Sequence, residues 1–394
     1  MRRFLNNGTL LLLLPISSCA DEQEARVAPV FGLDFSSVEH VVFAGWPELR
    51  SIDEVEFLTP GERLTSDLRL HEVRDLLVLE NDAIVVAHAG ASEVLRIEPS
   101  GTVSWRSGGP GEGPGEFSAM GRLQAWEGDT LIAVDPALRR ATFLSESGAL
   151  ARVLSGAWES PAPETPVVFS VPGQVIGVAR TGELVLLGPT HARRMGEPGL
   201  RQARTHLTVI SPSRGESRSE TLANLPGLWA YELRNPQALP AILAPMSAGT
   251  PVAIFADVFA WARTDAFDVV VFDRGGRVHQ VFSVDEPLDA VTSELRANYM
   301  DTWQPWFPVD ESVPFPSHVP AFDRVFFSRQ GDMWVRRFHW GEDVEQWARF
   351  SEDGQALDLF RFPPRVQIMA ATRSHAFGVS RDEMDVERLV RLPL

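Results

Sequence analysis

Short runs of alternating apolar and polar residues, separated by Gly, Pro, Asp and Ser, fill the chain from about Ser36 to its end. This alternation is typical of β-strands joined by turns. Five times an apolar residue runs into a short polar turn closed by glycine, and then into a second half-apolar run: Ile97–Gly101, Leu144–Gly148, Ile210–Gly215, Phe272–Gly276 and Phe350–Gly354. Because glycine supplies the positive φ that tight hairpins require, each turn is predicted to join the outer two strands of a four-stranded sheet.

Six further runs are predicted to be the second strands of such sheets: Asp82–Ala87, Asp129–Val134, Gly182–Leu187, Val252–Val258, Asp332–Phe338 and His375–Ser380. Repeated hairpins in one long chain indicate a radial repeat, and six second strands indicate six sheets. The chain ends after the run Val386–Leu392, so the last sheet lacks a fourth strand. The runs Val38–Ala44 and Val55–Leu58 precede the first full repeat and are available to complete it, which would close the ring.

The predicted fold is therefore an all-β, six-bladed β-propeller over residues 38–394, closed by an N-terminal strand. A seven-bladed ring and a two-sheet sandwich are the alternatives that this pattern leaves open. Residues 285–320 are predicted to form an insert between blades 4 and 5, with one helix over Asp285–Met300. Asp285 can cap this helix, Pro287 fits its first turn, and one face carries Leu288, Val291 and Leu295.

The first residues predict export. Arg2 and Arg3 form a basic start, and Leu10–Leu14 form an apolar run that is too short to span a bilayer. The following Ile16–Cys19 resembles a bacterial lipobox, in which the cysteine is lipidated and becomes the new amino terminus. Residues 1–19 are thus predicted to be a lipoprotein signal peptide ending at a lipidated Cys19, and residues 20–37 a flexible linker. An ordinary signal peptide that happens to contain Cys19 is the alternative.

Composition narrows the chemistry by exclusion. The chain carries 36 basic residues, all of them arginine, against 53 acidic residues, for a formal net charge of −17. The absence of lysine excludes Schiff-base catalysis and a phosphate-loop lysine. An acidic surface repels nucleic acid and anionic lipid headgroups, so no nucleic-acid partner is expected and the membrane is expected to be reached through the lipid anchor only. Cys19 is the only cysteine, so disulfides and thiol catalysis are excluded in the processed chain.

A glycine-rich run, Gly108–Phe117, directly follows a predicted outer strand. It is similar to the Gly-Glu-Gly-Pro-Gly-Glu-Phe run of bacterial six-bladed propellers of the NHL-like group, many of which are lipoproteins. With the hairpins, the resemblance covers roughly residues 38–394, and it implies a propeller anchored on the periplasmic face of the outer or inner membrane. A phosphate-binding loop is disfavoured because no lysine accompanies the run, no helix follows it, and Glu112 and Glu116 would repel phosphate.

In a propeller, the loops between blades and the loops between second and third strands emerge on one face around the central channel, which we call the mouth. The polar residues predicted to lie there and to bind a ligand are His88, Glu112, Glu116, Asp135, Arg139, His191, Arg263, His339 and Arg381, with Trp261, Trp340 and Asp382 beside them. Such a set suits a small polar or sugar-like ligand, a peptide, or an envelope protein. The alternative is that each is a solvated loop residue.

No catalytic set is recognisable in the sequence. A Gly-x-Ser-x-Gly elbow is missing, and the histidines are scattered with no close pair at ligand spacing. The predicted function is thus a binding or scaffolding module of the cell envelope without a cofactor. The alternative is a metal-assisted, lactonase-like hydrolase or lyase, with a divalent cation such as Ca²⁺ at the channel.

Overall fold

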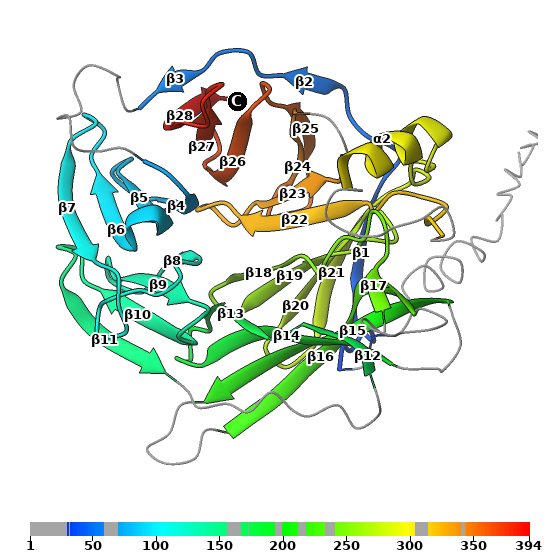
Figure 1. Cartoon of the computed structure of the whole chain (residues 1–394), viewed down its shortest axis with the longest axis horizontal. Helices are drawn as coiled ribbons and strands as arrows, with labels where there is room; N and C mark the ends of the chain where they lie inside the picture. The colour runs from blue at the N-terminus through cyan, green and yellow to red at the C-terminus, as the bar shows by residue number, and fades with distance from the viewer. Residues whose placement is uncertain are drawn as a thin grey trace, which may run out of the picture.

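Six β-sheets stand around a central axis in the computed structural model of the chain (Figure 1). The structure describes residues 30, 32–58, 70–155, 167–171, 173–193, 199–211, 218–232, 241–303, 314–339 and 343–394. Residues 1–29, which include Cys19 and the predicted signal peptide, lie outside the described residues. We number the sheets blades 1 to 6, in the order in which the chain forms their inner strands.

Blades 1 and 2 each have four antiparallel strands, which follow one another from the inside of the ring to the outside. Blade 1 consists of β4 (Val73–Val78), β5 (Ile84–His88), β6 (Glu93–Ile97) and β7 (Val103–Gly108), with a short 3-10 helix, η1 (Ala89–Ala91), between β5 and β6. Blade 2 consists of β8 (Leu123–Ala125), β9 (Leu131–Asp135), β10 (Arg140–Leu144) and β11 (Leu150–Ser155).

Blade 3 is larger, because its middle strands are 10, 13 and 15 residues long. It consists of β12 (Val167–Val171), β13 (Gln174–Val178), β14 (Leu184–Arg193), β15 (Gly199–Ser211), β16 (Arg218–Glu232) and β17 (Ala241–Leu243). β13 pairs with the first half of β14 and β12 pairs with its second half. The extra length is packed through four small buried side chains: Ala192, Ala203, Ala230 and Ala241.

The remaining blades follow the simple pattern. Blade 4 consists of β18 (Val252–Phe255), β19 (Val258–Ala262), β20 (Asp268–Asp273) and β21 (Val278–Val284). The helix α2 (Ser293–Trp303) follows blade 4. Blade 5 consists of β22 (Phe322–Phe327), β23 (Met333–Arg337), β24 (Gln346–Phe350) and β25 (Leu357–Arg361), and blade 6 begins with β26 (Val366–Ala371), β27 (His375–Arg381) and β28 (Glu387–Pro393).

The N-terminal segment runs along the outside of blades 4, 5 and 6 (Figure 1). β1 (Glu39–Phe43) adds parallel to β21, β2 (Leu49–Ser51) adds parallel to β25, and β3 (Glu56–Phe57) pairs antiparallel with β28. β3 is the fourth strand of blade 6, which confirms that an N-terminal strand closes the ring. The Val55–Leu58 run provides this strand, whereas the Val38–Ala44 run forms an extra outer strand on blade 4.

Hydrophobic clusters fill all six interfaces between neighbouring blades. At the seam between the last and first blades, Phe377 and Leu389 share a cluster with Leu95. At the interface of blades 5 and 6, Trp334 shares a cluster with Leu392. Because each blade is apolar on both faces, both faces are buried only when the ring is complete. The six-bladed, all-β fold is therefore confirmed.

The glycine hairpins are where they were predicted. Four closing glycines have positive φ, with values of 82°, 78°, 80° and 69° at Gly101, Gly148, Gly276 and Gly354. A residue with a β-carbon is strained in this region, so the glycines allow the tight turns. Part of the fifth turn, Ile210–Gly215, lies outside the described residues, and the strands that flank it, β15 and β16, pair as predicted.

Two local predictions were wrong. Val252–Val258 is not one second strand: it contains β18, a turn, and the start of β19, because Ala256 adopts a φ of 55° and reverses the chain without a glycine to mark it. The helix begins at Ser293 and not at Asp285. The Thr292 hydroxyl accepts the N–H of Leu295 at 3.1 Å, whereas the N–H of Asp285 donates to the Phe43 carbonyl at 2.9 Å and so continues the β-pairing with β1.

Candidate functional site

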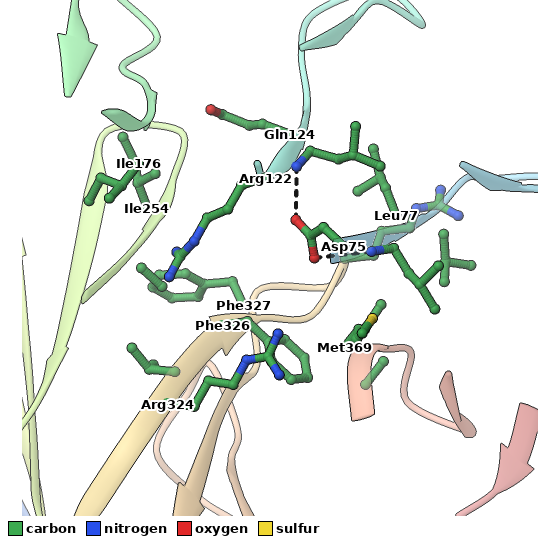
Figure 2. A pocket seen from close by; sticks show the side chains of 18 of the residues that line it. Asp75, Leu77, Arg122, Gln124, Ile176, Ile254, Arg324, Phe326, Phe327 and Met369 are labelled. Carbon is green, nitrogen blue, oxygen red and sulfur yellow. Dashed lines mark hydrogen bonds between the residues drawn. The ribbon is translucent and has the colours of Figure 1, made fainter. Parts of the chain in front are cut away.

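All six blades contribute their innermost segment to a cavity of about 170 Å³ in the central channel (Figure 2). One lining residue from each blade illustrates this: Leu76, Leu123, Ile176, Ile254, Val325 and Ala370. A concave cavity to which several structural elements contribute is a common place for a small ligand.

Five charged residues line this channel cavity beside apolar ones, and three of them lie at its centre: Asp75 in β4, Arg122 directly before β8, and Arg324 in β22. A side chain on an innermost strand cannot reach the outer surface of the ring. Charged side chains on such a strand therefore lie in the channel or between blades, where burial of an unpaired charge is unfavourable. Their presence there requires an electrostatic explanation.

The carboxylate of Asp75 is held by backbone donors. Oδ2 accepts the N–H of Leu123 at 2.8 Å and Oδ1 accepts the N–H of Leu76 at 3.0 Å, so Asp75 joins the inner strands of blades 1 and 2 (Figure 2). Burial raises the pKa of Asp75, and the hydrogen bond from Leu123 and the charges of Arg122 and Arg324 only partly oppose this.

The positive charges of Arg122 and Arg324 have fewer hydrogen-bond partners than the carboxylate of Asp75. Nη1 of Arg122 donates to the carbonyl of Val252 at 3.2 Å, on blade 4. Among the described residues, Arg324 makes no side-chain hydrogen bond and no ion pair within 4 Å. Burial lowers the pKa of both guanidinium groups, and the charge of Asp75 opposes this in both. The centre of the channel thus holds two cations and one anion, although the chain as a whole is strongly acidic.

Two further arginines line the same cavity but are paired. Arg74 lies 3.7 Å from Glu72, and Arg329 lies 2.8 Å from Glu80. Their charges are therefore balanced locally. The uncompensated charge belongs to Arg122 and Arg324.

A second cavity, of about 430 Å³, opens at the mouth between blades 5 and 6. Two predicted ligand residues, His339 and Arg381, line it. Its most connected side chain is Arg336, whose Nε and Nη2 donate to both oxygens of Asp323 and whose Nη1 donates to Glu345. These groups satisfy one another, so this mouth cavity is organised mainly as a structural network.

Several predicted mouth residues have structural contacts. Asp135 is fully buried and accepts the N–H groups of Ser118 and Leu138 at 2.7 and 2.8 Å. Arg263 is buried and pairs with Asp265 and Asp268, and Trp261 belongs to the core between blades 3 and 4.

His88 is buried at the end of β5. Its Nδ1 lies 3.2 Å from Oε1 of Glu93, and its Nε2 accepts the N–H of His71 at 3.3 Å. Burial lowers the pKa of His88, against the effect of Glu93. These contacts hold the β5–β6 connection against the segment that enters blade 1.

The glycine-rich run joins β7 of blade 1 to β8 of blade 2. Arg140, which is buried, donates to the carbonyl groups of Glu112, Gly113 and Glu116. The carboxylate of Glu116 accepts the N–H of Gly113 at 2.8 Å, whereas the side chain of Glu112 is exposed. This run leads the chain from the outer strand of one blade to the inner strand of the next.

The last candidates are spread over the molecule. Arg139 lies in the exposed turn between β9 and β10, and the His191 ring in β14 lies 6.1 Å from that of His206. Oδ1 of Asp382 accepts the N–H groups of Met384 and Val386 in the β27–β28 turn, and Trp340 lies outside the described residues.

None of the nine predicted ligand residues lines the channel cavity. The central charged residues of the lining are Asp75, Arg122 and Arg324. They were not predicted because ligand residues were expected in loops at the mouth, and not in or directly before inner strands. The signal was present in the sequence: two adjacent charges of opposite sign stand within Val73–Val78 and within Phe322–Phe327, whose other residues are apolar.

Two absences concern the described residues alone. No group of three or more His, Cys, Asp or Glu side chains in the described ranges is placed so that it could hold a metal ion. No helix within these ranges is long and apolar enough to cross a bilayer.

The sequence matches no protein-family model and no curated protein. In structure, the chain is similar to a candidate exported protein from Bacteroides fragilis, with 8% identity, 90% of this chain and 99% of that chain covered, and a TM-score of 0.45. It is similar to virginiamycin B lyase from Staphylococcus aureus, with 10% identity, coverage of 83% and 98%, and a TM-score of 0.40. It is also similar to the calcium-binding protein regucalcin from Agrobacterium tumefaciens, with 12% identity, coverage of 88% and 95%, and a TM-score of 0.41. Likenesses at this level say nothing of the ligand or reaction of this chain, and its membership of the NHL-like lipoprotein group stays a prediction.

Proposed function

We propose that this protein is an exported, lipid-anchored binding module of the cell envelope that holds a small anionic molecule in the central channel of its propeller. The proposed location in the cell envelope rests on the signal-peptide and lipobox pattern of residues 1–19. The ligand class rests on the channel cavity, into which all six blades contribute residues.

The observation that carries this proposal is the charge of the channel. Arg324 has no hydrogen-bond partner among the described residues, and Asp75 already accepts two backbone N–H groups. An anion that enters the channel would receive charge-assisted hydrogen bonds from Arg324, which is half-buried, and from Arg122, which is exposed.

The test is calorimetric titration of the purified full-length protein with acetate, benzoate and inorganic phosphate, with glucose as the neutral probe. We expect at least one anion to bind and glucose not to bind. Arg324→Gln should weaken anion binding about ten- to hundredfold, since a hydrogen bond to a charged group contributes about 1.5–3 kcal/mol. The matched control is Arg361→Gln, which changes an exposed arginine on the outer strand β25 of the same blade.

Two outcomes would overturn the proposal: no anion binds the wild type, or Arg324→Gln and Arg361→Gln bind anions equally well. A melting temperature that rises with Ca²⁺ or Zn²⁺ and falls again with a chelator would favour the metal-assisted hydrolase instead, because a ligand that binds only the folded state stabilises it.

A further inference from the structure

The channel cavity has an apolar wall as well as a charged one. In Figure 2, Ile176 and Ile254 lie on one side of the cavity, Met369 and Leu77 lie on the other, and Phe327 lies between them. These side chains come from blades 3, 4, 6, 1 and 5, so apolar surface surrounds the charged residues on several sides. A ligand that fills this cavity meets both kinds of surface at once.

The charge balance of the channel favours a ligand with one negative charge. Of the four arginines that line the cavity, Arg74 and Arg329 are paired with glutamates outside it, which leaves Arg122 and Arg324. Asp75 is the acidic residue of the lining, and the charges of Arg336 and Glu345, which also act on Arg324, are opposite in sign, so one positive charge is left over. A monoanion neutralises these three groups, whereas a dianion such as phosphate leaves them with one excess negative charge, so the charge balance favours a monoanion.

The volume limits the size of the ligand. An apolar cavity of about 150 Å³ accommodates one benzene molecule. The channel cavity, at about 170 Å³, therefore accommodates a body of about six carbon atoms together with the edge of a charged group. A long acyl chain would extend beyond this space.

We infer that the channel ligand is a small monocarboxylate with a compact apolar body, of about the size of benzoate or a branched short-chain acid; this inference rests on the proposed function. The carboxylate lies between Arg122 and Arg324, and the body lies against Ile176, Ile254 and Phe327. Charge-assisted hydrogen bonds orient the ligand, and the burial of its apolar surface supplies affinity in proportion to its size.

The test is a calorimetric series on the full-length protein with acetate, isobutyrate, isovalerate, benzoate and decanoate, together with benzamide as the neutral analogue of benzoate. We expect affinity to rise about fourfold for each added carbon up to the size of benzoate, from the usual contribution of a buried methylene. Decanoate should bind no more tightly than benzoate, because most of its chain would extend beyond the cavity. Benzamide should bind at least about tenfold more weakly than benzoate because it carries no charge.

A pair of variants separates the apolar wall from the charged one. Phe327→Asn should weaken benzoate binding at least about tenfold and leave acetate binding unchanged, whereas Arg324→Gln should weaken both. The matched control is Phe255→Asn: the Phe255 ring lies 5.6 Å from that of Phe327, but Phe255 does not line the cavity. This control should bind benzoate within about threefold of the wild type, and a melting curve of each variant reports whether it is folded.

The two proposals fail in different ways. If acetate, phosphate and benzoate bind with equal affinity, the channel binds anions but the inference about the apolar body is overturned. If benzamide binds as well as benzoate, the charge requirement is overturned. If Phe327→Asn weakens acetate and benzoate equally, Phe327 acts on the fold and not on the ligand. If no anion binds at all, the proposed function fails first.

Discussion

The carboxylate of Glu387 in the last blade accepts the backbone N–H of Val73 in the first blade at 2.7 Å, in a buried environment. Its other oxygen accepts two hydrogen bonds from the guanidinium of Arg381, at 3.0 and 2.8 Å. The residues it joins, Val73 and Glu387, are 314 positions apart in the sequence. Glu387 thus connects the two ends of the ring on its inner side, while β3 joins them on the outer side.

Glu387→Ala should therefore destabilise the protein by about 2–4 kcal/mol, because it leaves a buried N–H and a guanidinium without their acceptor. Glu387→Gln should destabilise the protein less than Glu387→Ala, since an amide oxygen can still accept the N–H of Val73. The measurement is the urea midpoint of each variant. Glu383→Ala, at an exposed position in the same blade, should stay within about 0.5 kcal/mol of the wild type. Equal midpoints for Glu387→Ala and Glu383→Ala would show that the seam does not depend on this contact.

Glu183 and Arg274 connect blades 3 and 4 on the side opposite the mouth. Nε and Nη2 of Arg274 donate to the two oxygens of Glu183 at 2.6 and 2.9 Å, and the hydroxyl of Ser211 adds a third donor at 2.6 Å. The hydrogen bonds from Arg274 are the main reason why the pKa of Glu183 falls from its usual value of 4.5 to about 2. A carboxylate with a lowered pKa stabilises the folded state at pH values above its unfolded pKa.

Glu183→Gln should accordingly lower stability by about 2 kcal/mol at neutral pH. The difference from the wild type should persist down to about pH 4.5 and disappear as the pH falls through about 2, because Glu183 is then protonated in the wild type as well. Urea midpoints over this pH range measure it. Glu127→Gln removes the exposed pair with Arg180 and should have little effect at any pH. A pH-independent difference would mean that Glu183 acts through packing and not through its charge.

The fold was predictable because its signals are local. Each glycine hairpin marks one blade, and the Val55–Leu58 run was the available partner for a last sheet with three strands of its own. The errors arose where a tertiary contact or an unmarked turn decides the structure. Ala256 turns the chain without a glycine, and Asp285 pairs with β1, a strand from the other end of the sequence.

The site was less predictable, because a sequence pattern shows which residues are polar but not which polar residues bond to one another. Asp135 and Arg263 are polar and lie near loops, yet Asp135 binds the N–H of Ser118 and Arg263 forms an ion pair with Asp268 of its own blade. Asp75 and Arg324 lie 249 positions apart in the numbering and face one another only because the ring brings blades 1 and 5 to a common axis. A rule that could have found them is that a charge in an inner strand of a propeller must lie in the channel or between blades.

Arg140 holds the glycine-rich run in place through three carbonyl groups. Arg140→Ala should therefore expose the amides of residues 109–117 to faster hydrogen exchange and lower the urea midpoint by about 2–3 kcal/mol, since several acceptors lose a charged donor. Arg139→Ala, at the neighbouring exposed position, is the control and should leave both measurements nearly unchanged. Unchanged exchange in Arg140→Ala would show that the glycines alone fix this run.

The predicted lipid anchor is tested by Cys19→Ala. Without the thiol, the precursor has no acceptor for lipid, and the acidic surface gives the chain no electrostatic attraction to anionic membranes. We expect the variant to leave the detergent phase in a phase-partitioning experiment, whereas Ser18→Ala, which keeps the cysteine and a small residue before it, should remain there. Membrane association of Cys19→Ala at the wild-type level would point to another mode of attachment.

Asp75 should set the affinity of the channel for anions through its charge. Burial raises its pKa, so its negative charge is costly in the folded protein and repels an anion bound beside Arg122 and Arg324. Asp75→Asn keeps an oxygen that can accept the N–H of Leu123 and removes the charge, so benzenesulfonate, which stays ionised at all working pH values, should bind about tenfold more tightly. In the wild type, affinity should rise as the pH falls through the raised pKa of Asp75, and in Asp75→Asn it should not change with pH. Asp53→Asn, at an exposed position on the N-terminal segment, is the control. Weaker binding by Asp75→Asn would mean that the carboxylate contacts the ligand as an acceptor, and that the ligand must carry a donor toward it.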